Sequence, residues 1–76
     1  MKIIYSEHAK QNLLERKIPE SYVLETLDYP EKIIVSRKGR KIAQKQIGNR
    51  LLRVIYKETE KVYIIVTVYY AKSERY

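Results

Sequence analysis

Residues 51–70 read LLRVIYKETEKVYIIVTVYY, and no other segment constrains the architecture as strongly. Apolar and polar residues alternate with a period of two on both sides of residues 58–60, which predicts strands at 51–57 and 61–70 joined by a short turn. On the second strand we expect one aliphatic row to face a covering layer of helices. That row comprises Val62, Ile64, Val66 and Val68.

The other face of these two strands carries polar side chains. On strand 51–57 the even-numbered row is free of charge, so we expect that row to be buried, because an unpaired charge is costly to bury. Arg53 then lies on the face opposite the helices, and Thr67 and Tyr69 of the next strand lie beside it.

Two further strands are predicted upstream, at 32–36 and 40–47, and short hairpins make the sheet an antiparallel meander. Two registers are open at the hairpin of residues 48–49. A two-residue loop pairs Lys45 with Leu52 on the core side, which is costly. A three-residue loop instead pairs Lys45 with Arg53 and points Gln44 inward, and we expect a bulge here.

Two short helices precede the strands. Ser6 is a suitable N-cap for a helix that runs to about Arg16, and Pro19 suits the first turn of a second helix that stops before Pro30. Residues 2–5 are a short apolar lead-in. The predicted fold class is α+β, with two N-terminal helices packed on one face of a four-stranded antiparallel sheet in the order ααββββ.

Length and composition limit the classes of protein. A chain of 76 residues can form one core and not two, so we expect a single domain over residues 1–76. With no Cys and one His, a disulfide framework and a thiolate metal site are excluded, zinc is effectively excluded, and we expect no cofactor. No apolar run suits a bilayer span and no signal-peptide pattern is present, so we expect a cytoplasmic protein without a membrane partner.

The charge is strongly positive, with a formal net value of +7 and a pI near 9.7. Residues 32–57 contain nine Lys or Arg and no acidic residue. Such a basic small domain is typical of nucleic-acid binding, although membrane surfaces and acidic proteins attract the same charge.

The sheet face opposite the helices is the candidate site. Arg53, Thr67 and Tyr69, together with Lys41 and Lys45, would combine cations with hydroxyls and an aromatic ring. Cations neutralise phosphates and Tyr rings stack on unpaired bases, so this surface suits RNA. The alternative interpretation is a solvated sheet face on which Lys and Arg are simply exposed.

His8 is the one side chain suited to proton transfer near neutral pH. It falls in the first turn of the first predicted helix, and the alternative is an ordinary exposed helix residue. The sequence has no P-loop, no Rossmann glycines, no Ser-His-Asp order and no carboxylate cluster for two-metal catalysis.

The chain as a whole resembles a small-domain family of bacteria and archaea near the RelE and ParE-like toxins, within the group of barnase, colicin and RelE-type metal-independent ribonucleases. The resemblance is carried by short motifs along nearly the whole chain. They are Ser6-Glu7-His8-Ala9, Glu15-Arg16-Lys17-Ile18-Pro19, Tyr29-Pro30, Leu52-Arg53-Val54-Ile55-Tyr56 and Ile65-Val66-Thr67-Val68-Tyr69.

This resemblance implies a RelE-like fold and metal-independent RNA cleavage, with an acidic antitoxin-like protein as a partner besides RNA. The implied catalytic residues are His8, Arg53, Thr67 and Tyr69. Further contacts to nucleic acid are expected from Arg37, Lys38, Arg40, Lys41, Lys45, Lys72 and Arg75. One position departs from the family pattern, because many relatives carry Arg four residues after the helix-one His, where this chain has Asn12.

Three functional hypotheses follow. The first is a toxin-like protein that cleaves or contacts RNA, in which a base activates the 2′-OH, Arg53 and Lys residues stabilise charge on the phosphorane, and an acid protonates the leaving oxygen. The second is a noncatalytic basic module that binds nucleic acid or an acidic partner through the same face. The third is a stable domain whose basic residues serve solubility alone.

Overall fold

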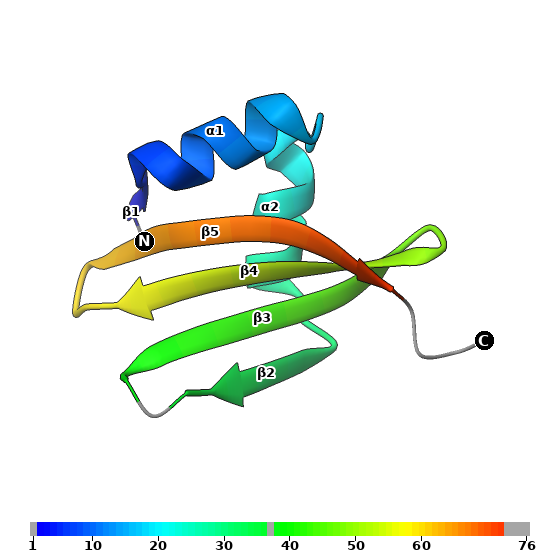
Figure 1. Ribbon diagram of the computed structural model, residues 1–76. Helices are drawn as coiled ribbons and strands as arrows, with labels where there is room; N and C mark the ends of the chain where they lie inside the picture. The colour runs from blue at the N-terminus through cyan, green and yellow to red at the C-terminus, as the bar shows by residue number, and fades with distance from the viewer. Residues whose placement is uncertain (1, 37, 73–76) are drawn as a thin grey trace.

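The computed structural model describes residues 2–36 and 38–72 and shows an α+β protein with two helices and a five-stranded mixed sheet (Figure 1). The strands are β1 (Lys2–Tyr5), β2 (Lys32–Val35), β3 (Arg40–Ile47), β4 (Arg50–Glu58) and β5 (Val62–Lys72), and the helices are α1 (Glu7–Glu15) and α2 (Glu20–Asp28). No helix in the described part of the chain is long and apolar enough to cross a membrane.

The sheet contains one strand more than the sequence predicts. Its order is β1-β5-β4-β3-β2, and β1 runs parallel to β5 while the other neighbours are antiparallel. The expected lead-in at residues 2–5 is therefore a strand, and the prediction of four strands in a purely antiparallel sheet is wrong in this respect. Four residues carry too little alternation to identify a strand, and β1 is held by a distant segment, with Lys2 opposite Val62 and Tyr5 opposite Ile65.

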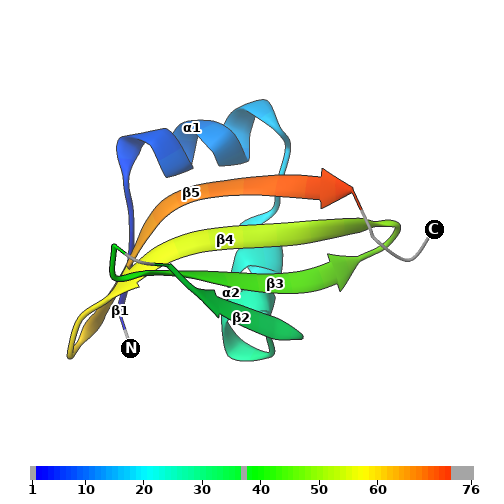
Figure 2. The same cartoon turned by 60° about the horizontal axis from the view of Figure 1, so that its bottom comes forward.

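The two helices form where the capping residues predict them. The Ser6 hydroxyl accepts a hydrogen bond from the Ala9 amide at 3.0 Å and donates one to the Val66 carbonyl at 2.9 Å, so it caps α1 and ties it to β5. Pro19 is the N-cap of α2. In Figures 1 and 2, α1 runs along β5 while α2 crosses behind β4 and β3, in agreement with the contacts of each helix.

A bulge in β5 changes which residues face the helices. Tyr56 pairs with Ile65 and Ile55 with Thr67, so Val66 is an extra residue without a partner on β4. The buried row of β5 is consequently Ile65 and Val68, flanked by the partly buried Tyr63 and Tyr70. Of the row Val62, Ile64, Val66 and Val68, only Val68 is buried. The prediction failed because consecutive apolar residues hide the change of parity.

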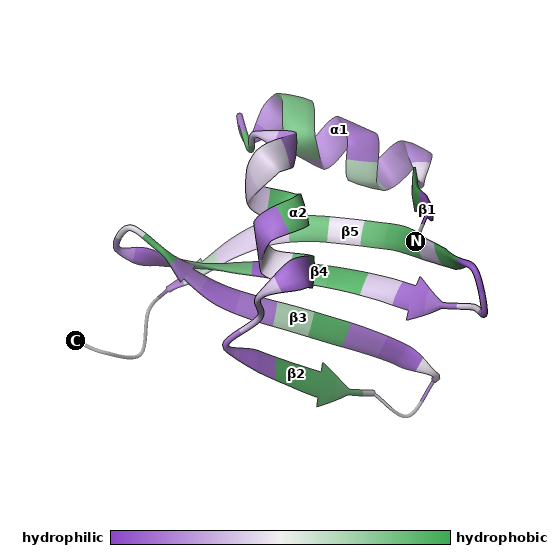
Figure 3. Cartoon of the chain, turned by 180° about the vertical axis from the view of Figure 1, so that it is seen from behind, coloured by the Kyte–Doolittle hydropathy of each residue, from purple (hydrophilic) through white to green (hydrophobic). Residues whose placement is uncertain are grey.

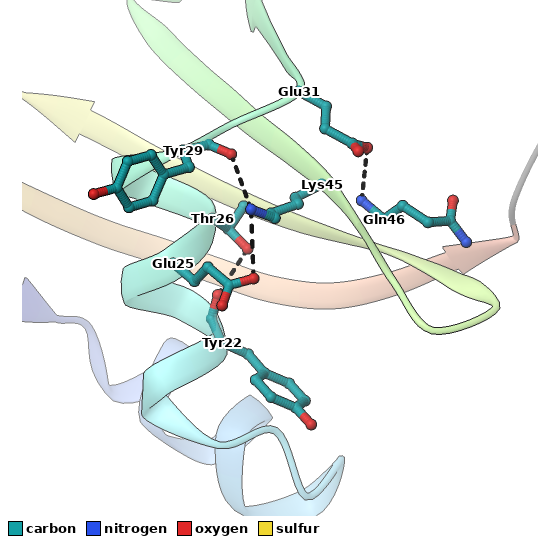
Figure 4. A network of polar contacts seen from close by, with 7 residues as sticks. All are labelled: Tyr22, Glu25, Thr26, Tyr29, Glu31, Lys45 and Gln46. Carbon is teal, nitrogen blue, oxygen red and sulfur yellow. Dashed lines mark hydrogen bonds and ion pairs between the residues drawn. The ribbon is translucent and has the colours of Figure 1, made fainter.

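The hairpin between β3 and β4 has the two-residue loop, with Gly48 at a φ of 62°. Lys45 pairs with Leu52 and lies on the helix side, and no bulge interrupts this strand pair. Its charge is accommodated by the end of α2. The Lys45 Nζ lies 3.4 Å from a Glu25 carboxylate oxygen and donates to the Tyr29 carbonyl at 3.3 Å (Figure 4). A cation at a helix C-terminus also interacts favourably with the helix dipole.

The two sides of the sheet are therefore distinct, and we call them the helix face and the open face. The hydrophobic core lies between the helices and the helix face, where Figure 3 shows apolar stretches of β4 and β5 next to α2. Its buried apolar residues are Ala9, Ile18, Val23, Ala43, Leu52, Val54, Tyr56, Ile65 and Val68.

Strand pairing and side-chain alternation define the open face. Its residues are Lys2, Ile4, Lys32, Ile34, Arg40, Ile42, Gln44, Gln46, Leu51, Arg53, Ile55, Lys57, Val62, Ile64, Thr67, Tyr69 and Ala71.

Candidate nucleic-acid interface

Arg53 and Tyr69 are direct neighbours at the centre of the open face. They occupy opposite positions on β4 and β5, and the Arg53 guanidinium lies 5.7 Å from the centroid of the Tyr69 ring. Both side chains are half-buried. The structure thus brings together two of the four residues expected to be catalytic, and it does so by the strand parity on which that expectation rests.

Thr67 follows the parity of the open face, but its hydroxyl is already engaged by α1. It donates a hydrogen bond of 2.6 Å to Asn12 Oδ1, which also accepts from the Val68 amide at 3.1 Å. Asn12 contacts Thr67 at the edge of β5 that β1 no longer covers, because β1 ends at Tyr5, opposite Ile65. The expectation that Thr67 lies wholly away from the helices is wrong, because its hydroxyl bonds to Asn12 of α1 directly beside the bulge at Val66.

Asn12, where the resemblance leads us to expect Arg, has a structural role in this fold. Its side chain is 4% exposed and satisfies two donors of the bulged strand with one oxygen. A buried amide without a partner is costly, so this position stabilises the fold. An Arg at the same place would lose these two bonds and require a buried charge.

His8 lies in the first turn of α1 and is exposed. In the described part of the chain its side chain forms no hydrogen bond or ion pair, either with Arg53, Thr67 or Tyr69 or with any other residue. Since α1 packs on β5 and β1, His8 belongs to the side of β5 that carries the helix, whereas Arg53 points from the open face. Its catalytic role stays a prediction.

Lys41 and Lys45 do not belong to the open face, and this corrects their placement there. Both follow the parity of the buried Ala43. Lys41 donates a 3.0 Å hydrogen bond to Glu58, whose acceptor oxygen and negative charge raise the pKa of Lys41 above its ordinary value. Lys45 is held by Glu25 and Tyr29. Both lysines are therefore engaged within the fold.

The remaining basic residues of the predicted site are spread over the molecule. Arg40 begins β3 on the open face, and Lys38 is exposed in the preceding turn. Lys72 is exposed at the end of β5 and follows the parity of the helix face. Arg37 and Arg75 lie outside the described residues.

Sequence reasoning missed two features of the open face. Lys57 pairs with Arg40 there, and its position four residues after Arg53 on the same strand was sufficient to place it. The second feature is an open hollow of about 370 Å³ beside the turn between β2 and β3. Its lining comprises Ser36, Lys38, Arg40, Ile42 and Ile55.

The charges of the two faces are compensated differently. Among the described residues the ion pairs are Lys10–Glu7, Lys41–Glu58 and Lys45–Glu25, and none of them involves an open-face cation. No open-face position carries an acidic residue. The buried Nε atoms of Arg40 and Arg53 also have no hydrogen-bond acceptor there. The open face therefore presents uncompensated positive charge.

Metal-ligating side chains are not clustered in the described part of the chain, where no group of three His, Asp or Glu residues could hold an ion. The chemistry that the open face offers is that of guanidinium and ammonium groups, which bind phosphate oxygens through charge-assisted hydrogen bonds.

A comparison with known families places the chain. Residues 5–70 match the family described as Domain of unknown function (DUF4258), and the chain belongs to this family. No curated protein and no solved structure matches the chain. The resemblance to the RelE and ParE-like toxins stays a prediction.

Proposed function

We propose that this protein binds RNA through the open face of its sheet. The observation that carries the proposal is the separation of charge between the two faces. The helix-face lysines of β3 each contact a carboxylate, whereas Arg40, Arg53 and Lys57 have no acidic partner among the described residues. Uncompensated cations on a sheet gain most from an anionic ligand, because binding releases the counterions of the phosphates.

Tyr69 favours RNA with unpaired bases over a purely electrostatic ligand. Tyr rings on a sheet are platforms on which unpaired bases stack, and adjacent cations hold the backbone. Tyr69 is half-buried and lies against Arg53, so the ring is held in place before a ligand arrives. A cytoplasmic location, where RNA is abundant, is part of this proposal.

Cleavage of the bound RNA without a metal ion is the second candidate, favoured by the position of Arg53. Its guanidinium can stabilise charge on a phosphorane, and the toxin resemblance implies this chemistry. His8 would take the proton of the 2′-OH as this oxygen attacks the phosphorus and would return it to the 5′-oxygen as the bond from phosphorus to that oxygen breaks. The RNA would therefore have to reach from the open face around β5. Thr67 would hold the strand bulge through Asn12 rather than bind the phosphate.

A matched pair of arginine variants tests RNA binding. Arg53 and Arg50 lie on the same strand, carry the same charge and each cover a tyrosine ring, Tyr69 at 5.7 Å and Tyr70 at 4.2 Å, but they lie on opposite faces. We expect Arg53→Ala to weaken binding of single-stranded RNA about tenfold and to reduce the salt dependence by about one ion.

Arg50→Ala should change both quantities much less, although it removes the same charge. Affinities are measured by fluorescence anisotropy with a labelled oligonucleotide at several salt concentrations. Equal losses of RNA affinity in the two variants would show that only the net charge matters. An affinity that does not change with salt concentration would exclude phosphate contacts.

The cleavage candidate needs a separate assay. Purified wild-type protein, His8→Ala and Arg53→Ala are each incubated with RNA in the presence of EDTA. The melting temperature of each variant is measured as well, so that only variants as stable as the wild type are compared with it. The candidate predicts cleavage by the wild type and its loss in both variants. If the wild type binds RNA but does not cleave it, cleavage is excluded and only the noncatalytic RNA-binding function remains.

An acidic antitoxin-like partner is the protein ligand that this surface would accept, since the same uncompensated cations attract carboxylates. An acidic peptide such as a poly-Glu segment should then compete with RNA, and Arg53→Ala should weaken both ligands. Failure of the peptide to displace RNA would restrict the open face to nucleic acid.

A further inference from the structure

We propose that the hollow lined by Ile42 and Ile55 seats one unpaired base of the RNA strand, with the flanking phosphates on Arg40 and Arg53. This inference rests on the proposed function and assigns a subsite within the open face. The hollow of about 370 Å³ falls within the size range of small-molecule sites, which begins near roughly 300 Å³.

The floor of the hollow is apolar. Ile42 and Ile55 are directly paired across β3 and β4, and both are half-buried. Ile34 of β2 pairs with Ile42 and extends the same row to the sheet edge. Burying this aliphatic surface under a ring of low polarity is favourable, because apolar area is removed from water, and the face of a base is such a ring.

Cations lie on both sides of this apolar row. Arg40 stands two residues before Ile42 on β3, and Arg53 stands two residues before Ile55 on β4, each pointing to the open face. Because the two strands are antiparallel, these arginines lie on opposite sides of the row. Two residues along a strand span about 7 Å, so a base on the row has a guanidinium on either side for its phosphates.

The charge state of the arginines supports an anionic ligand. No described carboxylate forms an ion pair with Arg40 or Arg53. Their Nε atoms are buried, so we expect phosphate oxygens to bind the terminal Nη atoms of the two guanidinium groups. Lys38 and Ser36 add an ammonium group and a hydroxyl to the rim.

The residues that line the hollow also predict which nucleotides the subsite binds. A base in a duplex is stacked and paired, so only an unpaired nucleotide can lie on the isoleucine floor. Among the described residues of the lining, Ser36 is the one neutral side chain that can form a hydrogen bond, which is too little to distinguish the four bases. We therefore expect preference for single strands with little preference for sequence.

Methyl-resolved NMR of the wild-type protein tests the subsite directly. A single-stranded trimer of adenosine is titrated into protein with labelled isoleucine methyl groups, and ring currents of a seated adenine should shift Ile42 and Ile55. Ile33 is the matched control, because it is 48% exposed and points from the helix face of β2. Ribose 5-phosphate, which has a phosphate and no base, is the second probe.

The outcomes separate this inference from the proposed function. Shifts of Ile42 and Ile55 with the trimer, and much smaller shifts with ribose 5-phosphate and at Ile33, support the subsite. If the trimer binds and depends on Arg53 but leaves both methyl groups unmoved, the subsite is wrong while RNA binding stands. If ribose 5-phosphate moves them equally, the hollow binds phosphate rather than a base.

Variants at Arg40 give a second readout. Arg40→Ala should weaken binding of the trimer at least about threefold, as expected for one lost phosphate contact, and Arg50→Ala, on the helix face at the far end of the sheet, should not. Equal effects of the two substitutions would contradict a local site.

Discussion

The helix face and the open face differ more in how their charges are paired than in their amino-acid types. On the helix face, Lys41 and Lys45 have a carboxylate oxygen at 3.0 and 3.4 Å. On the open face, Arg40, Arg53 and Lys57 have none within the described residues. The basic residues of segment 32–57 therefore include cations held by a carboxylate, namely Lys41 and Lys45, and cations without such a partner among the described residues. All described open-face cations belong to the second group, and so does Arg50 of the helix face, which lies over the Tyr70 ring.

The largest difference between the faces should appear in stability, at two adjacent leucines of β4. Leu52 points into the core and is 0% exposed, whereas Leu51 points to the open face and is half-buried. We expect Leu52→Ala to lower the free energy of unfolding by about 2–5 kcal/mol and Leu51→Ala by about 1 kcal/mol or less. Urea denaturation followed by circular dichroism measures both, and equal losses would mean that the open face is as closely packed as the core.

The contact between α1 and the bulge of β5 should give the next largest effect. Asn12→Ala leaves the Val68 amide without its acceptor and is expected to cost about 1–3 kcal/mol of stability. Thr67→Val removes only the hydroxyl and should cost roughly 1 kcal/mol. Chemical denaturation of both variants tests this order. A larger loss for Thr67→Val would assign the hydroxyl another structural partner.

Two lysines offer the smallest but most direct test of the comparison. Lys45→Met removes the contacts to Glu25 and Tyr29 and should lower stability by about 0.5–1 kcal/mol without weakening RNA binding beyond its charge effect. Lys57→Met should leave stability within about 0.5 kcal/mol and reduce the salt dependence of RNA binding by about one ion. The prediction fails if both substitutions change the same property.

Several features of the fold could be predicted from local chemistry. Ser6, Pro19 and Pro30 mark helix ends because caps and prolines act within one turn. The hairpin at residues 48–49 was recognisable as well. Its register was not, because the cost of placing Lys45 on the core side is offset by Glu25 and Tyr29, which only the tertiary structure brings to it.

The errors at the candidate site have the same origin. Arg53 was placed correctly because the alternate row of residues 51–57 carries no charge and is buried, and Tyr69 because it lies on the same side of the bulge as the buried Val68. Lys41 was misplaced because its partner Glu58 lies on another strand. The engagement of Thr67 by Asn12 joins residues 55 positions apart, and a single sequence contains no signal for such a bond.

The parallel pairing of β1 with β5 has a consequence for the order of folding. The hairpins from β2 to β5 join neighbouring segments and can form as the chain is synthesised, whereas β1 must wait until its partner has left the ribosome. Until then Ile3 and Tyr5 have no strand to pair with, and α1 lacks the Val66 carbonyl that receives the Ser6 hydroxyl. Of the five described strands, β1 is thus synthesised before the others but is among the last to pair, and its pairing with β5 completes the packing of α1 on the sheet.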